Sequence, residues 1–235
     1  MIAKIIINSN VLSNNVALII SFLAISLGYL LGSIPPAYIL GKLLHGVDIR
    51  QQGSGNVGGA NAGRLFGKKV FIMVALFDIF KGTIAVFIAT LIVPGNTASS
   101  GLFSSPELFY ALTGFMAIVG HCYSMLLGFS GGKGAATTAG VVLAFDPIIF
   151  VILLSSWLIT VGTTRFTSLG NLVAVSLLPF TFNFLQDYEE YTLLGWLILV
   201  LIFWKHRENI VRLINGEERK FGNKEKIQSN IDDQK

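Results

Sequence analysis

The sequence has few charged residues and almost no cysteine. Charged side chains make up 13% of the 235 residues, whereas they make up about 25% of an average soluble domain. Cys122 is the single cysteine, so no disulfide can form within the chain. With 53% hydrophobic residues and a mean hydropathy of +0.69, this composition excludes an ordinary soluble domain and predicts an integral membrane protein.

The pattern of a cleavable leader is also missing. The first ten residues, MIAKIIINSN, carry an isoleucine patch too short for the core of a signal peptide. We therefore expect the first long apolar run to remain as a span. The net charge of +4 comes from Lys and Arg between the apolar runs and in the tail, a pattern that favours membrane lipids as partners and not nucleic acid.

Six apolar runs approach the roughly 20 residues that a helix needs to cross a bilayer, at 15–37, 70–93, 107–128, 136–162, 167–186 and 190–205. Lys and Arg concentrate in cytoplasmic loops, so the basic segment between the first and second runs should be cytoplasmic. Six crossings would then leave the basic tail after Lys205 on the outer side, against its charge. Asp146 and Pro147 interrupt the fourth run, and proline disfavours continuation of a helix. We therefore predict two helices there, a short one at 134–145 and another at 148–162.

The predicted fold is thus all-α and polytopic, with about seven transmembrane helices, one of them short, the N-terminus outside and the C-terminus in the cytoplasm. In this topology the basic segment 50–69, Lys133 and Arg165 face the cytoplasm, whereas the loops 94–106 and 186–191, which contain no Lys or Arg, face away. We divide the chain into an N-terminal extracellular segment, one membrane-embedded domain and a disordered cytoplasmic tail, at 1–14, 15–221 and 222–235.

The first polar motif, RQQGSGNVGGANAGRLFGKK at 50–69, combines glycines with basic residues. Glycines let backbone N–H groups approach an anion closely, and arginines make bidentate contacts to phosphate oxygens. The motif lacks the lysine-serine/threonine end of a Walker loop and the spacing of a Rossmann fingerprint. A flexible loop that only carries cytoplasmic charge is the alternative. The candidate phosphate-binding residues are Arg50, Gly53, Ser54, Gly55, Asn56, Asn61 and Arg64.

The second motif, GFSGGKGAATTAG at 128–140, has glycines on both sides of a lysine and leads into an apolar helix. A glycine turn before a helix presents unpaired N–H groups and the positive end of the helix dipole to an anion. The candidate residues are Gly131, Gly132, Lys133, Gly134 and, in the first turn of the helix, Thr137.

The third motif, WKHRENIVRLINGEERKFG at 204–222, follows the last span. His206, Asn209 and Arg212 are three residues apart and share one face of a helix. A basic helix that binds lipid head groups explains the Lys and Arg of this motif. It explains His206 and Asn209 poorly.

Three ionisable residues lie within the apolar runs. Asp78 and Lys81 are close enough along a helix to pair, and ionisable residues at such depth are functional candidates. A neutralising structural pair is the equal alternative. His121 is either functional or a hydrogen-bonded packing residue.

Together and in this order, the motifs resemble the bacterial membrane glycerol-3-phosphate acyltransferases that use acyl phosphate, the PlsY family. The match covers nearly the whole chain, and its joint spacing is highly specific. The matching stretches are GSIP at 32–35, GVDIRxxGSGNVGxxNxxR at 46–64, DxxKG at 78–82, GH at 120–121, GGKGxAT at 131–137 and HRENIxRLxxGxE at 206–218.

The resemblance implies transfer of a fatty acyl group from acyl phosphate to glycerol 3-phosphate, giving lysophosphatidic acid and inorganic phosphate early in phospholipid synthesis. It implies a multi-pass protein of the bacterial plasma membrane with a cytoplasmic active site, a functional link to an enzyme that produces acyl phosphate, and neither cofactor nor metal. The His-x4-Asp pair of other glycerolipid acyltransferases is absent, because no histidine here has an aspartate five residues on.

The resemblance also suggests roles for the candidate residues. We expect Arg64 and Lys133 to neutralise phosphate groups, and His206 and Asn209 to orient glycerol 3-phosphate. Ser54 is expected to hydrogen-bond a reacting substrate rather than to be acylated, because no base is visibly paired with it. The remaining motif residues are expected to bind substrate.

Three positions depart from the family pattern. The family usually has threonine where this chain has Ala60, lysine or arginine where it has Ser130, and often serine where it has Asn171. The departures at Ala60 and Ser130 leave open a catalytically altered lipid-binding membrane protein. A separate alternative is a transporter for organic anions, with Arg50, Arg64 and Lys133 along an anion path. A transporter would place polar groups near mid-membrane on several helices, whereas most of the polar groups here crowd one face.

Overall fold

The protein is described as a computed structural model over residues 19–92, 105–223 and 227. All regular structure in these ranges is helical, so the predicted all-α fold is confirmed. The predicted extracellular segment 1–14 and most of the predicted tail lie outside the described residues.

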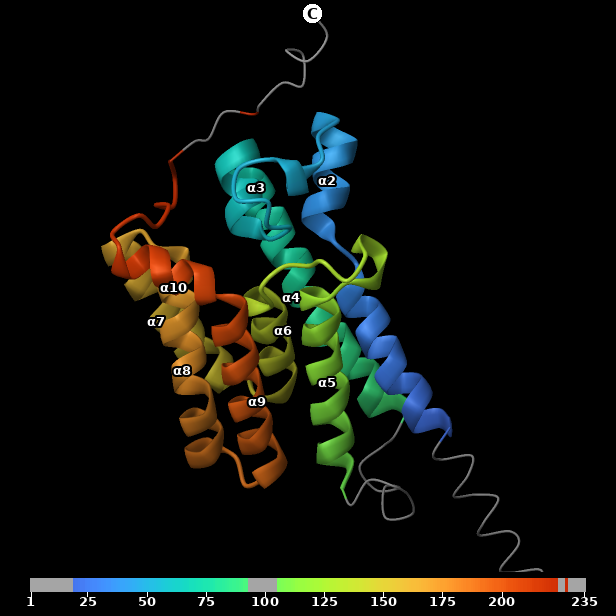
Figure 1. The fold of residues 1–235 in the computed structure, drawn as a ribbon. Helices are drawn as coiled ribbons and strands as arrows, with labels where there is room; N and C mark the ends of the chain where they lie inside the picture. Colours follow the sequence, from blue (N-terminus) through green and yellow to red (C-terminus); the bar gives the residue numbers. More distant parts are fainter. Residues whose placement is uncertain (1–18, 93–104, 224–226, 228–235) are drawn as a thin grey trace, which may run out of the picture.

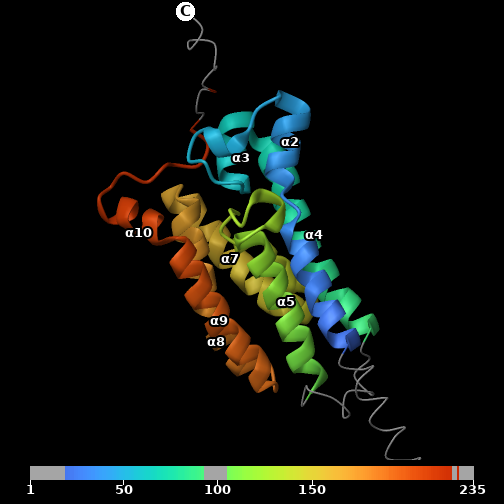
Figure 2. The same ribbon diagram turned by 45° about the vertical axis from the view of Figure 1, so that its right-hand side comes forward.

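The long helices stand side by side as a bundle, with α4 (Lys68–Ile92) and the helix of residues 19–33 along one flank (Figure 1). Three short helices gather at one end of this bundle, and the same arrangement is visible after rotation (Figure 2). We call this the polar end; its helices are α2 (Pro36–His45), α3 (Gly59–Phe66) and α10 (Arg207–Ile214). The other elements are η1 (Ile49–Gln51), α5 (Pro106–Cys122), η2 (Met125–Leu127), α6 (Ala135–Phe145), α7 (Pro147–Thr164), α8 (Thr167–Leu185) and α9 (Glu189–Lys205).

Two prolines divide the first apolar run. Pro35 and Pro36 have no backbone N–H, so the helix of residues 19–33 stops before them and α2 begins with Pro36 in its first turn. At this break the carbonyl of Ile34 accepts a hydrogen bond from Nζ of Lys81, at 2.9 Å. The run predicted as one span at 15–37 is therefore interrupted, and its second helix continues to His45.

The division of the fourth apolar run is confirmed. Asp146 lies between α6 and α7, and its carboxylate accepts from the backbone N–H groups of Ile148 and Ile149, at 2.6 and 3.1 Å. This is an N-cap with proline in the first turn of the helix. With 11 residues, α6 is about 16 Å long at 1.5 Å per residue, which is half of a bilayer core.

Small residues let α6 approach α4 closely. A Cβ atom on Gly140 would lie 1.9 Å from the carbonyl oxygen of Ile79, and one on Gly82 would lie 2.4 Å from the carbonyl oxygen of Thr137. Such contacts between backbones are typical of helices that pack within membranes. The N-terminus of α6 is thereby held against the middle of α4.

Within the described ranges, five segments are long and apolar enough to cross a membrane: Ile19–His45, which includes the break before α2, Lys68–Ile92, Pro106–Leu127, Pro147–Thr164 and Thr167–Leu185. The helix α9 has 17 residues and exposes apolar side chains such as Val200, which is 68% exposed. With α6, these make the seven predicted helices. Their number as crossings and their orientation stay predictions.

Candidate active site

A cavity of about 350 Å³ opens among α3, α4, α6, α7, α8 and the junction of α9 with α10. Residues from all three polar motifs line it: Ser54, Asn56, Asn61, Arg64, Lys133, Gly134, His206, Asn209 and Arg212. The other predicted site residues lie outside its lining: Arg50, Gly53, Gly55, Gly131, Gly132 and Thr137. Segments far apart in the sequence thus supply one pocket.

Asn61 organises the glycine-rich segment before α3. Its side chain is fully buried; Nδ2 donates to the carbonyl oxygens of Gln52 and Asn56, both at 3.1 Å, and Oδ1 accepts from the N–H of Ser54 at 3.0 Å. Nη2 of Arg64 donates to Oγ of Ser54 at 3.2 Å. The segment is therefore a folded wall of the pocket, and part of it is helix α3 rather than flexible loop.

Arg50 points to a different partner. Its guanidinium donates to both carboxylate oxygens of Asp48, at 3.0 and 2.7 Å, and lies 5.0 Å from the centre of the Tyr38 ring. This ion pair neutralises Arg50 at the surface.

The glycines before Lys133 serve close packing. The N–H of Gly132 donates to the carbonyl oxygen of His121 at 2.9 Å, and a Cβ atom at Gly132 would lie 2.1 Å from Nε2 of the same histidine. Gly134 has φ +84°, a conformation that favours glycine, and it caps α6. The turn thus packs against the end of α5, and Lys133 lines the pocket.

Lys133 takes part in a network across the pocket. Its Nζ donates to Oδ1 of Asn209, Nδ2 of Asn209 donates to Oε1 of Glu218 at 2.7 Å, and Nε of Arg212 donates to Oε2 of Glu218 at 2.8 Å. Oγ of Ser168 also donates to Glu218, at 3.0 Å. Burial, together with the nearby Arg212 charge, lowers the pKa of Lys133 from 10.5 to about 8.

A buried ionic cluster closes the inner wall of the pocket. Nζ of Lys81 lies 2.8 Å from Oδ1 of Asp78, which confirms the proposed pairing. Nδ1 of His121 lies 3.2 Å from the same oxygen and 2.9 Å from Nζ of Lys81. Asp78 and His121 both line the pocket, so this cluster is structural support and pocket surface at once.

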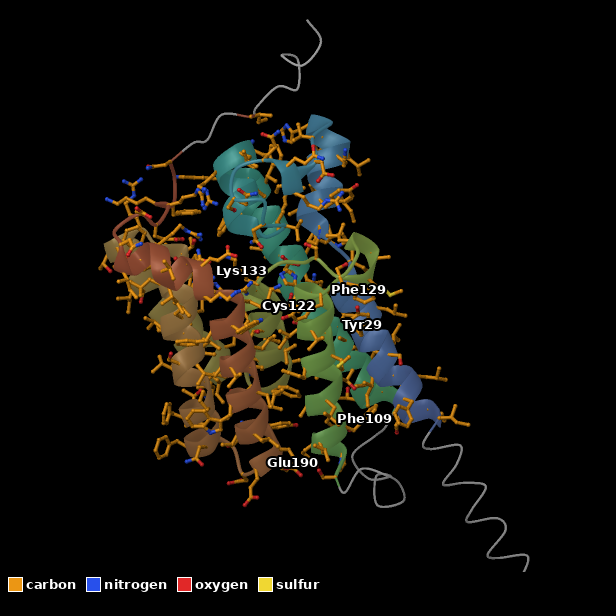
Figure 3. The ribbon with its side chains drawn as sticks, viewed as in Figure 1. Tyr29, Phe109, Cys122, Phe129, Lys133 and Glu190 are labelled. Atoms are coloured by element: carbon orange, nitrogen blue, oxygen red, sulfur yellow. The ribbon has the colours of Figure 1, made fainter. Side chains whose placement is uncertain are left out.

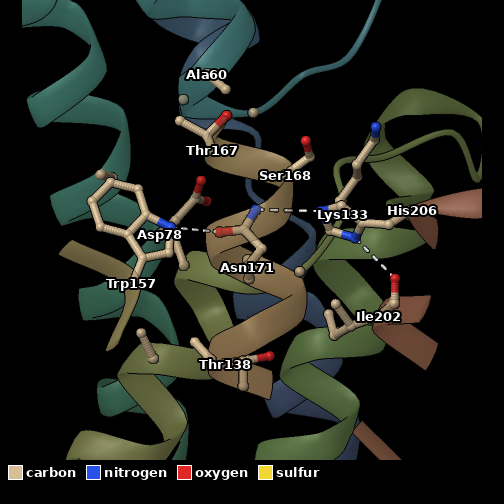
Figure 4. A pocket seen from close by; sticks show the side chains of 18 of the residues that line it. Ala60, Asp78, Lys133, Thr138, Trp157, Thr167, Ser168, Asn171, Ile202 and His206 are labelled. Carbon is tan, nitrogen blue, oxygen red and sulfur yellow. Dashed lines mark hydrogen bonds between the residues drawn. The ribbon is translucent and has the colours of Figure 1, made fainter. Parts of the chain in front are cut away.

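His206 lies at the junction between α9 and α10. Its Nδ1 is 2.9 Å from the carbonyl oxygen of Ile202, and its Nε2 is 3.3 Å from Nδ2 of Asn171 (Figure 4). Burial, and after it the charge of Lys133, lowers the pKa of His206 to about 4. The imidazole is therefore neutral at physiological pH.

Several pocket residues were not among the sequence candidates. Ser168 and Asn171 lie one turn apart at the start of α8, and Trp157 comes from α7. Glu218 comes from the segment after α10. The polar run TSLGN and the match at Glu218 were the available signals; nothing local marks Trp157. Of the departures, Ala60 and Asn171 line the pocket, and Ser130 is exposed outside its lining.

The pocket is amphiphilic. Beside its cationic and amide groups, it is lined by apolar side chains of α7, α8 and α9, namely Phe150, Leu153, Leu154, Val175, Leu178 and Ile202. Such a lining suits a ligand with anionic groups and an apolar tail. Among the described residues, no group of three His, Cys, Asp or Glu side chains could hold a metal ion.

The fold and the pocket define an all-helical membrane protein whose site suits an amphiphilic anion. The sequence model of a family described as glycerol-3-phosphate acyltransferase matches residues 22–216. The chain belongs to this family, and it is accordingly an integral membrane acyltransferase.

Two relatives with the same description support this membership. Glycerol-3-phosphate acyltransferase of Lawsonia intracellularis is 38% identical over 212 residues, covering 89% of this chain and 100% of the relative. The enzyme of the same name from Syntrophomonas wolfei is 39% identical over 196 residues, covering 83% and 94%.

Two crystal structures of PlsY, an integral membrane glycerol 3-phosphate acyltransferase, are also similar. Its glycerol 3-phosphate form has a TM-score of 0.77 and 34% identity, and its lysophosphatidic acid form has a TM-score of 0.75 and 33% identity. Each comparison covers 86% of this chain and 96% of the other. The predicted membrane fold and the resemblance to the PlsY family are therefore confirmed.

Proposed function

We propose that the protein transfers a fatty acyl group from acyl phosphate to a hydroxyl of glycerol 3-phosphate, releasing lysophosphatidic acid and inorganic phosphate. The observation that carries the proposal is the amphiphilic pocket, in which Arg64, Lys133 and Arg212 meet an apolar lining. Two phosphate groups and one acyl chain match these two kinds of surface. The forms in which the similar PlsY structures were solved support an acceptor of this kind.

The roles follow from position. Arg64 and Lys133 neutralise the phosphate groups, which would otherwise repel each other. Asn209, bonded to Lys133, and His206 next to it orient glycerol 3-phosphate. Ser54, which accepts from Arg64, hydrogen-bonds a reacting substrate.

The chemical step needs little acid–base catalysis. The acceptor hydroxyl oxygen bonds to the acyl carbonyl carbon, the bond from that carbon to the phosphate oxygen breaks, and the hydroxyl proton passes to the departing phosphate. Acyl phosphate is already an activated anhydride, so the protein contributes proximity and stabilisation of the developing negative charge. Direct transfer leaves no acyl group on the protein. Intact mass spectrometry after incubation with palmitoyl phosphate alone tests this, because an acyl-Ser54 adduct would refute direct transfer.

The polar end is proposed to face the cytoplasm. Lys133 lies towards that end and Glu190 at the opposite end (Figure 3), and Lys68 and Lys69 begin α4 beside α3. Lys and Arg concentrate on the cytoplasmic side of bacterial membrane proteins. The donor would then come from a cytoplasmic reaction that forms acyl phosphate.

The site can be tested with matched lysine variants. Lys133→Ala is expected to lower formation of lysophosphatidic acid from palmitoyl phosphate and glycerol 3-phosphate at least 100-fold, because a half-buried cation beside both phosphates is lost. Lys68→Ala removes an exposed lysine outside the pocket lining and should retain activity within about twofold. Equal activity of the two variants would refute the assignment of the pocket as the active site.

A further inference from the structure

The two ring nitrogens of His206 have different hydrogen-bond partners. Its side chain is buried, with 1% exposure, and Nδ1 faces the carbonyl oxygen of Ile202 at 2.9 Å. A carbonyl oxygen can only accept, so Nδ1 carries a proton and donates it. The state of Nε2 then depends on which end of the Asn171 amide it meets.

Trp157 determines the direction of that amide. An indole N–H can only donate, and Nε1 of Trp157 lies 2.8 Å from Oδ1 of Asn171 (Figure 4). With its oxygen held by the indole, the Asn171 amide presents its NH2 group to Nε2 of His206. A donor at this position requires Nε2 to accept and therefore to be unprotonated.

We infer that Asn171, held by Trp157, is a positioning residue that fixes His206 as the neutral Nδ1–H tautomer and so prevents it from acting as a proton carrier. Its catalytic meaning rests on the proposed function: with both ring nitrogens engaged, His206 orients the acceptor as part of a rigid wall, and the proton goes to the departing phosphate. The tautomer itself is a property of the protein without substrate.

The charges around the ring agree with this state. Lys133, from the turn before α6, and Lys205, on α9, both disfavour a positive imidazole, whereas the Glu218 carboxylate favours one. Burial outweighs the carboxylate, and the pKa of His206 falls to about 4. From α8, the NH2 group of Asn171 also opposes protonation, because it donates to the nitrogen that would take the proton.

A serine at position 171 would carry a hydroxyl that can both donate and accept. Serine would therefore leave the protonation of Nε2, and with it the charge of the histidine, open. An asparagine whose oxygen is already bound can only donate to His206.

Nitrogen-15 NMR of the full-length protein labelled at histidine, in detergent micelles, tests the inference. Long-range proton–nitrogen correlations distinguish the two neutral tautomers and the charged ring, and His206→Phe identifies the His206 signals. We expect the Nδ1–H pattern, unchanged between pH 5.5 and 8, as for a group whose pKa is about 4. A charged ring or the Nε2–H tautomer at pH 7 would overturn the inference.

Variants make the test specific. Asn171→Asp replaces the donor by an acceptor, so His206 should become protonated at Nε2 and titrate near neutral pH, whereas Asn183→Asp, at an exposed position on the same helix, should leave its signals unchanged. Asn171→Ser and Trp157→Phe should each let Nε2 take up a proton, so the charged ring should appear at higher pH than in the wild type; this keeps the test decisive if the aspartate variant does not fold. A wild-type pattern in all three variants at Asn171 and Trp157 would refute the positioning role of Asn171. Because the readout needs no turnover, absence of acyl transfer would refute the proposed function separately.

Discussion

The side chain of Asn61 closes the glycine-rich wall, and its replacement by leucine should disable the enzyme without unfolding the bundle. The three shortest bonds lost with the amide are those donated to Gln52 and Asn56 and the one accepted from Ser54. Two longer ones, donated to Ile49 at 3.5 Å and accepted from Arg64 at 3.4 Å, are lost as well. At about 1 kcal/mol for each of the three shortest bonds, the folded conformation of this segment loses about 3 kcal/mol relative to conformations in which the bonds are not made. Since about 1.4 kcal/mol corresponds to a factor of ten, kcat/KM should fall on the order of 100-fold.

The assay is formation of lysophosphatidic acid by purified protein, together with the unfolding temperature. The largest cluster of buried apolar residues lies among helices α4 to α9. Only a smaller cluster, which includes Ile49, Val57 and Ala62, lies at the wall, so Asn61→Leu should lower Tm by only a few degrees. Asn183→Leu makes the same chemical change at an exposed position and should keep both quantities near the wild-type values. A kcat/KM for Asn61→Leu within threefold of wild type would refute the view that this side chain builds the site.

Further predictions concern charge, packing and the outlying arginine. Because the pKa of Lys133 is about 8 in the free protein, Lys133 loses its charge as pH rises through that value. In a pH–rate profile, kcat/KM for glycerol 3-phosphate should therefore decline above about pH 8. A flat profile to pH 9.5 would contradict the role assigned to Lys133. Gly140→Val would drive a Cβ into the backbone of α4 and should lower Tm by more than about 5 °C, whereas Gly162→Val, with no neighbour within 4 Å, should change it little. Arg50→Ala removes a surface pair with Asp48 and the contact with the Tyr38 ring, both outside the pocket lining, so activity should stay within about threefold. Arg64→Ala should lower activity more than about 100-fold; the reverse order would place the phosphate site elsewhere.

Much of the fold follows from local properties of the sequence. Apolar runs mark the long helices, and Asp146 followed by proline marks the division between α6 and α7, because capping and the missing N–H act within a few residues. The break at Pro35 and Pro36 was not predicted, since the run stays apolar on both sides of it. The extension of α2 to His45 also needed the structure.

The site was predictable where a motif determines its own geometry. Ser54, Asn61 and Arg64 come together within one short segment, as expected, and the third motif brings His206, Asn209 and Arg212 to the same pocket. The position of Arg50 depends on the turn that brings Asp48 beside it.

Contacts between distant segments could not be predicted from spacing. Trp157 and Asn171 meet across the turn between α7 and α8, and Glu218 meets Asn209 only because the chain folds back after α10. Both contacts depend on tertiary packing. These contacts orient the amides of Asn209 and Asn171. The two amides in turn determine which atoms are offered to Lys133 and His206 for hydrogen bonding.

The most direct test of the central claim measures both products from one reaction. Purified protein in liposomes is incubated with glycerol 3-phosphate and either palmitoyl phosphate or palmitoyl-CoA, and lysophosphatidic acid and inorganic phosphate are quantified together. We predict equimolar products with palmitoyl phosphate, dependent on glycerol 3-phosphate, and no lysophosphatidic acid with palmitoyl-CoA. Equal rates with the two donors, or phosphate release without glycerol 3-phosphate at the same rate, would contradict the proposed transfer.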